Sequence, residues 1–427
     1  MTPAKVVMTR LIEMLRQADW LTRDRVIAWG LVLFLEELLL LLFLALWQHG
    51  VFVPVRTPPA SDFVSFYAAG KLALAGTPQL AYDQAAHYLA QQQTTDPGAP
   101  HQYFFYPPVY LILCAGLASM PYVIAFAVFQ VCTLGLFIVT MRRVLRERGA
   151  GWLAPLLAFP AVFWTFGLGQ NAFLTAALFG GFTLLVDKRP IGAGILLGAL
   201  CYKPHFGLLV PGALIAGRRW TAFAAATATI AWLVGISIAL FGWQTWHAYL
   251  VAFVHSGDVY NSGAIDFAGI VTPYGAARLL GFAPWPAYGI QGAAAMVMAL
   301  LIALLWRRNV SRSVSRNMRA ASLLSATLLA VPLCLLYDKL LVLVAIGWLV
   351  REARESGFLP WEKLVLLAVY PMSLLTWCAG QTFHLPLGPM ITCMVLVLCL
   401  RRVWLALPGA SPVRGQQPRF QALGASP

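Results

Sequence analysis

The residues of this sequence that could do chemistry lie in a few polar turns between long apolar segments. Asp62 opens an aromatic-rich stretch, 61–70, directly after the first apolar segment. A carboxylate partly withdrawn from water at a membrane edge can act as a general base. Lys203, His205 and Lys339 lie in two later polar turns, and such cations and donors suit a phosphate group. A base combined with phosphate-binding cations indicates group transfer from a lipid-linked phosphate donor.

The same cations also have a purely structural explanation. Asp338 directly precedes Lys339, and it could equally form a buried ion pair with Lys339 or with Lys203. Asp96 is interpreted as a solvated turn residue, and Asp83 as a helix cap. Asp258 and Asp266 lie in a glycine-rich loop and stay open. Asp62 and Asp338 remain as the two acidic residues that we expect at the membrane edge beside aromatic residues.

The composition indicates a protein embedded in a membrane. The chain has 427 residues, of which 60% are hydrophobic and 11% charged, and its mean hydropathy is +0.74. Soluble domains are roughly 25% charged. The formal charge of +14 is interpreted as basic cytoplasmic loops that contact membrane lipids, not as a nucleic-acid surface. The seven cysteines fall in apolar segments without metal-ligand spacing, and we expect neither a metal nor a cofactor.

The pattern of apolar segments predicts an all-α polytopic membrane protein with roughly 11–13 transmembrane helices. Residues 1–25 read as a cytoplasmic amphipathic segment and 405–427 as a disordered C-terminal tail, so both termini are expected in the cytoplasm. The transmembrane domain spans 26–404, with external loops at 49–106 and 243–284. Dense basic clusters then fall inside, as the positive-inside rule requires.

The first external loop is expected to contain two short helices flat on the outer leaflet, over 62–75 and 79–93. Pro121 is expected to divide the apolar stretch 107–141 into a re-entrant half and a full span. In the first span, at least one of Glu36 and Glu37 should face the bundle or be protonated, because charge at that depth is costly.

From residue 152 onward the apolar segments alternate across the membrane, beginning with one outward segment over 152–167. Several are only 11–16 residues long, shorter than the roughly 20 that a full span needs. The polar turns around Gln170, Lys203 and Asp338 all fall on the same outer side as Asp62. Short segments beside these turns predict a cavity that opens from the outer face.

Over residues 58–350 the sequence resembles glycosyltransferase family 87, membrane transferases that use polyprenyl-phosphate sugars and have the C-type fold. The resemblance rests on an ordered set of short motifs: Asp62-Phe63, Phe66-Tyr67-Ala68-Ala69, Gly76, Tyr82-Asp83, Tyr106-Pro107-Pro108, Gly169-Gln170-Asn171, Tyr202-Lys203-Pro204, Gly217-Arg218-Arg219-Trp220, Ala276-Ala277-Arg278-Leu279-Leu280-Gly281 and Tyr337-Asp338. One departure is Lys339, where the family often has a hydrophobic residue.

The resemblance implies an inverting hexosyl transfer, with mannose as the first candidate, from a polyprenyl-phosphate-linked donor to a hydroxyl of a lipid or glycan acceptor. Asp62 would be the general base. The implied donor-binding set is Lys203, Tyr202, His205, Gln170, Asn171, Tyr337, Asp338 and Tyr106. The implied location is the bacterial inner membrane, with the site facing the periplasm. Polyprenyl phosphate is already a workable leaving group, so the chemistry requires no nucleotide or metal.

Two other functions compete with this interpretation. A transporter or flippase of lipid-linked glycans is also polytopic and also carries charge within the membrane, but it predicts paired broken segments in the two halves, and none is evident. An O-antigen ligase or polymerase would rely on a large external loop late in the sequence that carries several basic residues. The loop 243–284 contains one arginine, Arg278, and no lysine.

Overall fold

The computed structural model describes residues 3–49, 62–94, 100–310 and 313–407. Across these ranges the chain is nearly all helical and contains no strand. The fold class predicted from the composition, an all-α polytopic membrane protein, is confirmed. Residues 50–61 of the first predicted external loop and 408–427 of the predicted tail lie outside the described part of the chain.

Within the described ranges, six helices are long and apolar enough to cross a membrane. They are α2 (Arg23–His49), α6 (Tyr122–Leu145), α12 (Trp220–Phe241), α15 (Pro284–Trp306), α18 (Glu362–Phe383) and α19 (Leu387–Ala406). The other crossings that the sequence predicts fall on shorter elements: α7 (Leu153–Leu157), α8 (Pro160–Gly167), α9 (Ala172–Leu185), α10 (Pro190–Ala199), η2 (Leu200–Tyr202), η3 (Pro204–Gly207), α11 (Val210–Ala216), α16 (Arg316–Ala330), η6 (Leu336–Lys339) and α17 (Leu340–Ser356).

Prolines account for several of the breaks. Pro160, Pro190 and Pro204 each stand at the first position of an element, where the missing N–H costs nothing. The outward segment expected over 152–167 is not one continuous helix, because α7 ends at Leu157 and the chain restarts as α8 at Pro160. The residue before a proline is pushed out of the helical region, and Phe159 accordingly has ψ 124°. Pro121 divides 107–141 as predicted.

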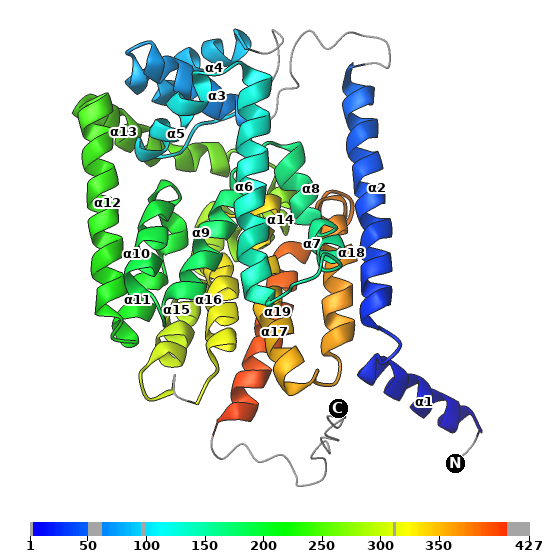
Figure 1. The fold of residues 1–427 in the computed structure, drawn as a ribbon. Helices are drawn as coiled ribbons and strands as arrows, with labels where there is room; N and C mark the ends of the chain where they lie inside the picture. The colour runs from blue at the N-terminus through cyan, green and yellow to red at the C-terminus, as the bar shows by residue number, and fades with distance from the viewer. Residues whose placement is uncertain (1–2, 50–61, 95–99, 311–312, 408–427) are drawn as a thin grey trace.

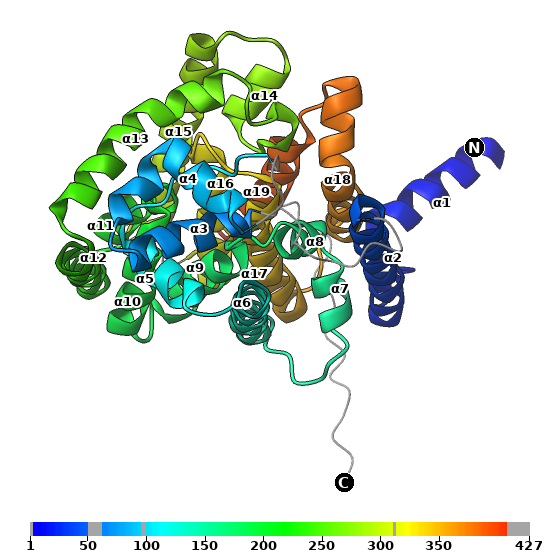
Figure 2. The same ribbon diagram turned by 90° about the horizontal axis from the view of Figure 1, so that it is seen from above.

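The elements between the long helices gather at one end of the bundle, called here the upper end because it is at the top of Figure 1. This upper layer contains α3 (Phe63–Leu74), η1 (Pro78–Tyr82), α4 (Gln84–Gln92), α5 (Val109–Ala118) and α13 (Trp243–Asn261). Seen from above, these helices lie across the ends of α9, α10 and α16 (Figure 2). Two further elements, η4 (Phe267–Gly269) and α14 (Pro273–Leu279), follow α13.

A close helix contact fixes α3 within the upper layer. Gly70 of α3 lies against α5, and a Cβ atom at this position would lie 2.1 Å from the carbonyl oxygen of Cys114. Residues 63–70 of α3 are all buried. Only a glycine permits the two helix backbones to approach so closely, and this contact positions the start of α3, where Asp62 lies.

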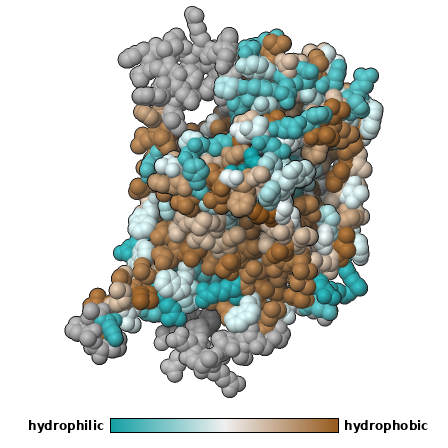
Figure 3. All heavy atoms as spheres, turned by 180° about the vertical axis from the view of Figure 1, so that it is seen from behind, coloured by the Kyte–Doolittle hydropathy of each residue, from teal (hydrophilic) through white to brown (hydrophobic). Residues whose placement is uncertain are grey.

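The opposite, lower end carries the basic clusters and α1 (Pro3–Gln17). Asp187, in the turn between α9 and α10, pairs with Arg219 at 2.6 Å and with Arg319 at 3.2 Å. Arg146 after α6 pairs with Glu355 of α17 at 3.0 Å. These ion pairs join the connections at one end, while apolar side chains form a belt across the middle of the face shown in Figure 3. The molecule therefore has a charged lower end and a distinct upper layer, as expected for a multi-pass membrane protein.

Glu37 and Glu36 differ in their surroundings. Glu37 is 3% exposed and faces the bundle, whereas Glu36 is exposed on the outer surface of α2. The prediction that at least one of the pair faces the bundle is confirmed.

Candidate functional site

Asp62 stands at the start of α3, in the upper layer. Its Oδ2 accepts a hydrogen bond of 2.7 Å from Nε2 of Gln170. Oε1 of Gln170 accepts a hydrogen bond of 3.4 Å from the hydroxyl of Tyr106. Three residues predicted from separate turns therefore form one hydrogen-bonded chain.

A helix-ending motif places Gln170 at this point. The N–H of Gln170 donates to the carbonyl of Thr165 at 2.9 Å, and the N–H of Gly169 donates to that of Phe166 at 3.2 Å. This pattern is the Schellman motif, which requires a left-handed residue just after the helix. Gly169 supplies it, with φ +67°. The Gly169-Gln170-Asn171 sequence thus ends α8, turns the chain and presents the amide to Asp62.

Lys203 and Asp338 form a buried ion pair 135 positions apart in sequence. Nζ of Lys203 donates to Oδ1 of Asp338 at 2.8 Å, and both side chains are 5% exposed. Oδ2 of Asp338 accepts a 3.0 Å hydrogen bond from the N–H of Leu335, which fixes the carboxylate within η6. Of the two ion pairs that the sequence left open, the one between Lys203 and Asp338 is therefore formed.

Lys339 is directed elsewhere. Its Nζ donates to the carbonyl of Ser373 at 3.2 Å and to the hydroxyl of Thr376 at 2.8 Å, both on α18. The adjacent residues Asp338 and Lys339 thus contact different elements, and Lys339 is separate from the cation at the site.

Aromatic rings connect the two halves of the site. The ring centroids of Tyr106 and Tyr110 are 4.7 Å apart, and those of Tyr110 and Tyr202 are 5.1 Å apart. Nζ of Lys203 lies 5.3 Å from the ring centroid of Tyr337, within cation–π range. The hydroxyl of Tyr202 lies 2.8 Å from that of Thr175. His205 is half-buried in η3, with its ring 4.4 Å from that of Phe206.

Several buried polar groups of the site have no hydrogen-bond partner among the described residues. They are both side-chain atoms of Asn171, the hydroxyl of Tyr110 and Oε1 of Gln130. The Asn171 amide lies near the Tyr106 and Tyr110 hydroxyls, outside the geometry of a hydrogen bond. Leaving such groups unpaired costs free energy. The site therefore has unused donors and acceptors for a polar ligand.

Sequence reasoning missed two residues of this cluster. Gln130 of α6 donates from Nε2 to the carbonyl of Gln170 at 3.3 Å. An amide in the middle of an apolar span is rare, and this signal was available in the sequence. Tyr110 lies within an apolar helix, where nothing in the local pattern distinguishes it from other packed aromatic residues.

Burial raises the pKa of the Asp62 carboxyl to about 6, while the hydrogen bond from Gln170 and the positive charge of Lys203 oppose the shift. Asp62 is thus close enough to Lys203 to interact with it electrostatically. A carboxylate with a pKa near 6 is ionised at neutral pH and is a stronger base than an ordinary aspartate.

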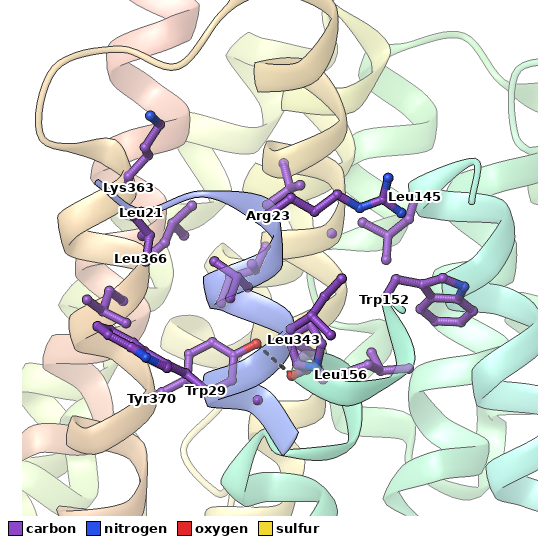
Figure 4. Close-up of a pocket in the computed structure, with 18 of the residues that line it drawn as sticks. Leu21, Arg23, Trp29, Leu145, Trp152, Leu156, Leu343, Lys363, Leu366 and Tyr370 are labelled. Carbon is purple, nitrogen blue, oxygen red and sulfur yellow. Dashed lines mark hydrogen bonds between the residues drawn. The ribbon is translucent and has the colours of Figure 1, made fainter. Parts of the chain in front are cut away.

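A cavity lies elsewhere, toward the lower end. It has a volume of about 640 Å³ and lies between α2, α6, α7, α17 and α18. Tyr370 on its wall donates a 2.8 Å hydrogen bond to the carbonyl of Pro155 (Figure 4). None of the predicted site residues lines this cavity. It is therefore distinct from the outer cavity that the sequence predicts beside Asp62.

Comparison with known proteins supplies a family assignment. No curated protein and no solved structure matches the chain. The sequence model of glycosyltransferase family 87 matches residues 104–336, more than half of the chain. The matched range contains Tyr106, Gln170, Asn171, Tyr202, Lys203 and His205, while Asp62 precedes it and Tyr337 and Asp338 follow it directly. The chain belongs to glycosyltransferase family 87.

Proposed function

We propose that this membrane glycosyltransferase transfers a hexosyl group, with mannose as the first candidate, from a polyprenyl-phosphate sugar to an acceptor hydroxyl at the periplasmic face of the bacterial inner membrane. The observation that carries the proposal is the joining of Asp62 to Gln170 by a 2.7 Å hydrogen bond, with the charge of Lys203 nearby. A base and a phosphate-binding cation then belong to one site.

In this mechanism the Asp62 carboxylate removes the proton of the acceptor hydroxyl as its oxygen attacks the anomeric carbon. The bond between that carbon and the phosphate oxygen breaks, and polyprenyl phosphate leaves with the electron pair. One displacement from the face opposite the phosphate inverts the anomeric configuration. Gln170 holds the carboxylate through Oδ2, so Oδ1 is the oxygen that we assign to the proton.

Lys203 stabilises the negative charge on the departing phosphate. It is paired with Asp338 in the structure, so the phosphate must compete with that carboxylate or share the ammonium with it. The unpaired amide of Asn171 and hydroxyl of Tyr110 supply neutral groups that a sugar or phosphate can satisfy. Neutral hydrogen bonds to sugar hydroxyls would orient the anomeric carbon for attack.

The test is a transfer assay with the chain reconstituted in lipid. Polyprenyl-phosphate mannose, labelled in the sugar, is incubated with a lipid and glycan extract of a bacterial envelope. We expect labelled product with an anomeric configuration opposite to that of the donor. Movement of intact donor between leaflets without cleavage would instead support a flippase and overturn the proposal, as would product of retained configuration.

A further inference from the structure

A second, smaller cavity opens in the upper layer between η1, α4, the segment 101–105 and α13. Its volume is about 170 Å³. Its lining includes seven aromatic or imidazole side chains: Tyr82, His87, His101, Tyr103, Phe104, Phe105 and His255. No lysine, arginine, aspartate or glutamate lines it. The cavity is thus aromatic and polar but carries no formal charge while its histidines are neutral.

The hydrogen bonds of His87 determine which nitrogens carry protons. Nε2 of His87 lies 3.0 Å from the carbonyl of Ser65, which can only accept, so Nε2 is the donor. Burial lowers the pKa of His87 to about 4, so the ring is neutral near pH 7 and Nδ1 is an acceptor. This Nδ1 accepts from Nε2 of Gln91 at 3.1 Å, and Nε2 of His101, 3.3 Å away, is a second donor to it. Both nitrogens of His87 are used, which leaves this ring unable to serve as a metal ligand without rearrangement.

The two more exposed histidines keep acceptor nitrogens. Nδ1 of His255 lies 2.8 Å from the carbonyl of Val251 and therefore donates, which leaves its Nε2 as an acceptor. Nδ1 of His101 is likewise an acceptor, because Nε2 is the donor. Hydroxyl groups of a ligand can donate to both nitrogens, and the ring of Tyr103 provides an apolar face beside them.

Hydrogen bonds connect the walls of this cavity to the first turn of α3, where the proposed base Asp62 lies. His87 donates to the carbonyl of Ser65, and Oγ of Ser65 donates to the carbonyl of Tyr103 at 3.1 Å. Ser65 lies in the first turn of α3, and its N–H donates to the carbonyl of Asp62 at 3.2 Å. A second hydrogen bond links the cavity to the site: the hydroxyl of Tyr82, a lining residue, donates to the carbonyl of Tyr106 at 2.9 Å. The cavity walls and Asp62 are therefore connected through the first turn of α3.

Size and charge select the class of ligand. Pockets for drug-sized molecules have volumes of roughly 300–1,000 Å³, so 170 Å³ suits a single ring. Aromatic walls with uncharged hydrogen-bonding groups match the C–H faces and hydroxyl edges of a neutral sugar. An anionic sugar or a phosphate would find no cation in the lining.

We propose that this cavity is the acceptor subsite and holds one neutral sugar ring of the acceptor, which is therefore a glycan or glycolipid and not a simple lipid alcohol. The role of the cavity as an acceptor subsite rests on the proposed function. Sugar binding by the cavity does not require sugar transfer and is therefore tested separately.

The binding test uses saturation-transfer NMR on the purified chain with three probes: methyl α-mannoside, methyl β-glucoside and methyl glucuronide. Ala252→Trp introduces an indole into the cavity from α13, and Tyr103→Ala removes one aromatic face. His247→Ala is the matched control, because His247 is an exposed histidine of α13 that does not line the cavity. We expect signal from a neutral glycoside that is at least fivefold stronger than that from the glucuronide. Both cavity variants should reduce it at least fivefold and the control should leave it unchanged.

The kinetic arm measures transfer from labelled polyprenyl-phosphate mannose to the envelope glycolipid extract. Ala252→Trp should raise the apparent acceptor KM at least tenfold while the apparent donor KM changes less than threefold. Equal binding of the neutral glycoside by the native chain and both cavity variants overturns the inference. A native chain that binds the glycoside in the cavity but never cleaves the donor overturns the proposed function and leaves a sugar-binding site.

Discussion

At Asp62 two effects act in opposite directions on one carboxyl. Burial favours its neutral form, while the Gln170 amide and the Lys203 charge favour its ionised form, and the resulting pKa is about 6. Because the folded-state pKa lies above the ordinary value of about 3.9, protonation favours the folded state. The contribution of this group to stability is therefore greatest below about pH 4 and falls as the pH rises to about 6.

The same pKa predicts how transfer depends on pH. We expect kcat/KM for the donor to be constant above about pH 7 and to fall about tenfold per pH unit well below pH 6, because only the ionised carboxylate can accept the proton. The measurement is a rate profile from pH 4.5 to 8.5 in lipid, with a melting temperature at each pH to exclude unfolding. A rate that stays constant down to pH 5 would contradict the assignment of Asp62 as the base.

Lys203 is predicted to have both a structural and a functional role, and a double variant separates the two. Lys203→Met leaves Asp338 buried and unpaired, which typically costs about 3–5 kcal/mol. Lys203→Met combined with Asp338→Asn removes both charges, so we expect it to recover most of the melting temperature. Donor use should remain impaired in the double variant, seen as an apparent donor KM raised at least tenfold. Native donor kinetics in the double variant would show that Lys203 has only a structural role.

At the scale of elements, the contact between α3 and α5 holds Asp62, the proposed base, in place. Gly70→Ala puts a Cβ atom 2.1 Å from a backbone oxygen, so α3 must shift and Asp62 with it. We expect a lower melting temperature and at least a tenfold loss of kcat. Gly116→Ala is the matched control, because Gly116 is an exposed position of α5 with no atom within 4 Å of its added Cβ. That control should be neutral or stabilising by up to about 1 kcal/mol. Equal activity of the two variants would contradict this role for the contact.

The element pattern was largely predictable, and the pairing of residues across elements was not. The two short helices after Asp62 and the break at Pro121 follow from local turn chemistry. The hydrogen bond between Asp62 and Gln170 joins residues 108 positions apart, and no local pattern specifies it. The break between α7 and α8 was not predicted, because the segment is apolar throughout, although Pro160 is a local signal for the break.

For the whole molecule, the distribution of charge agrees with the order of the predicted turns. The ion pairs of Asp187 and Glu355 link the basic connections at the lower end. Asp62, Gln170, Lys203 and Asp338 meet at the other side of the apolar belt. The sequence predicts this separation because basic clusters mark cytoplasmic loops. It also predicts a cavity that opens at the site, which stays a prediction. Of the two cavities described above, one lies beside α2 and the other within the upper layer.

The central claim is that Asp62 removes the acceptor proton during transfer from a polyprenyl-phosphate sugar. The most direct measurement compares the native chain with Asp62→Asn, both reconstituted in lipid with labelled polyprenyl-phosphate mannose and envelope extract. The substituted amide oxygen can still accept the Gln170 hydrogen bond, so the variant should fold and insert normally. We predict a loss of at least a thousandfold in kcat with a melting temperature equal to or above that of the native chain. Transfer by Asp62→Asn within tenfold of the native rate would contradict the account.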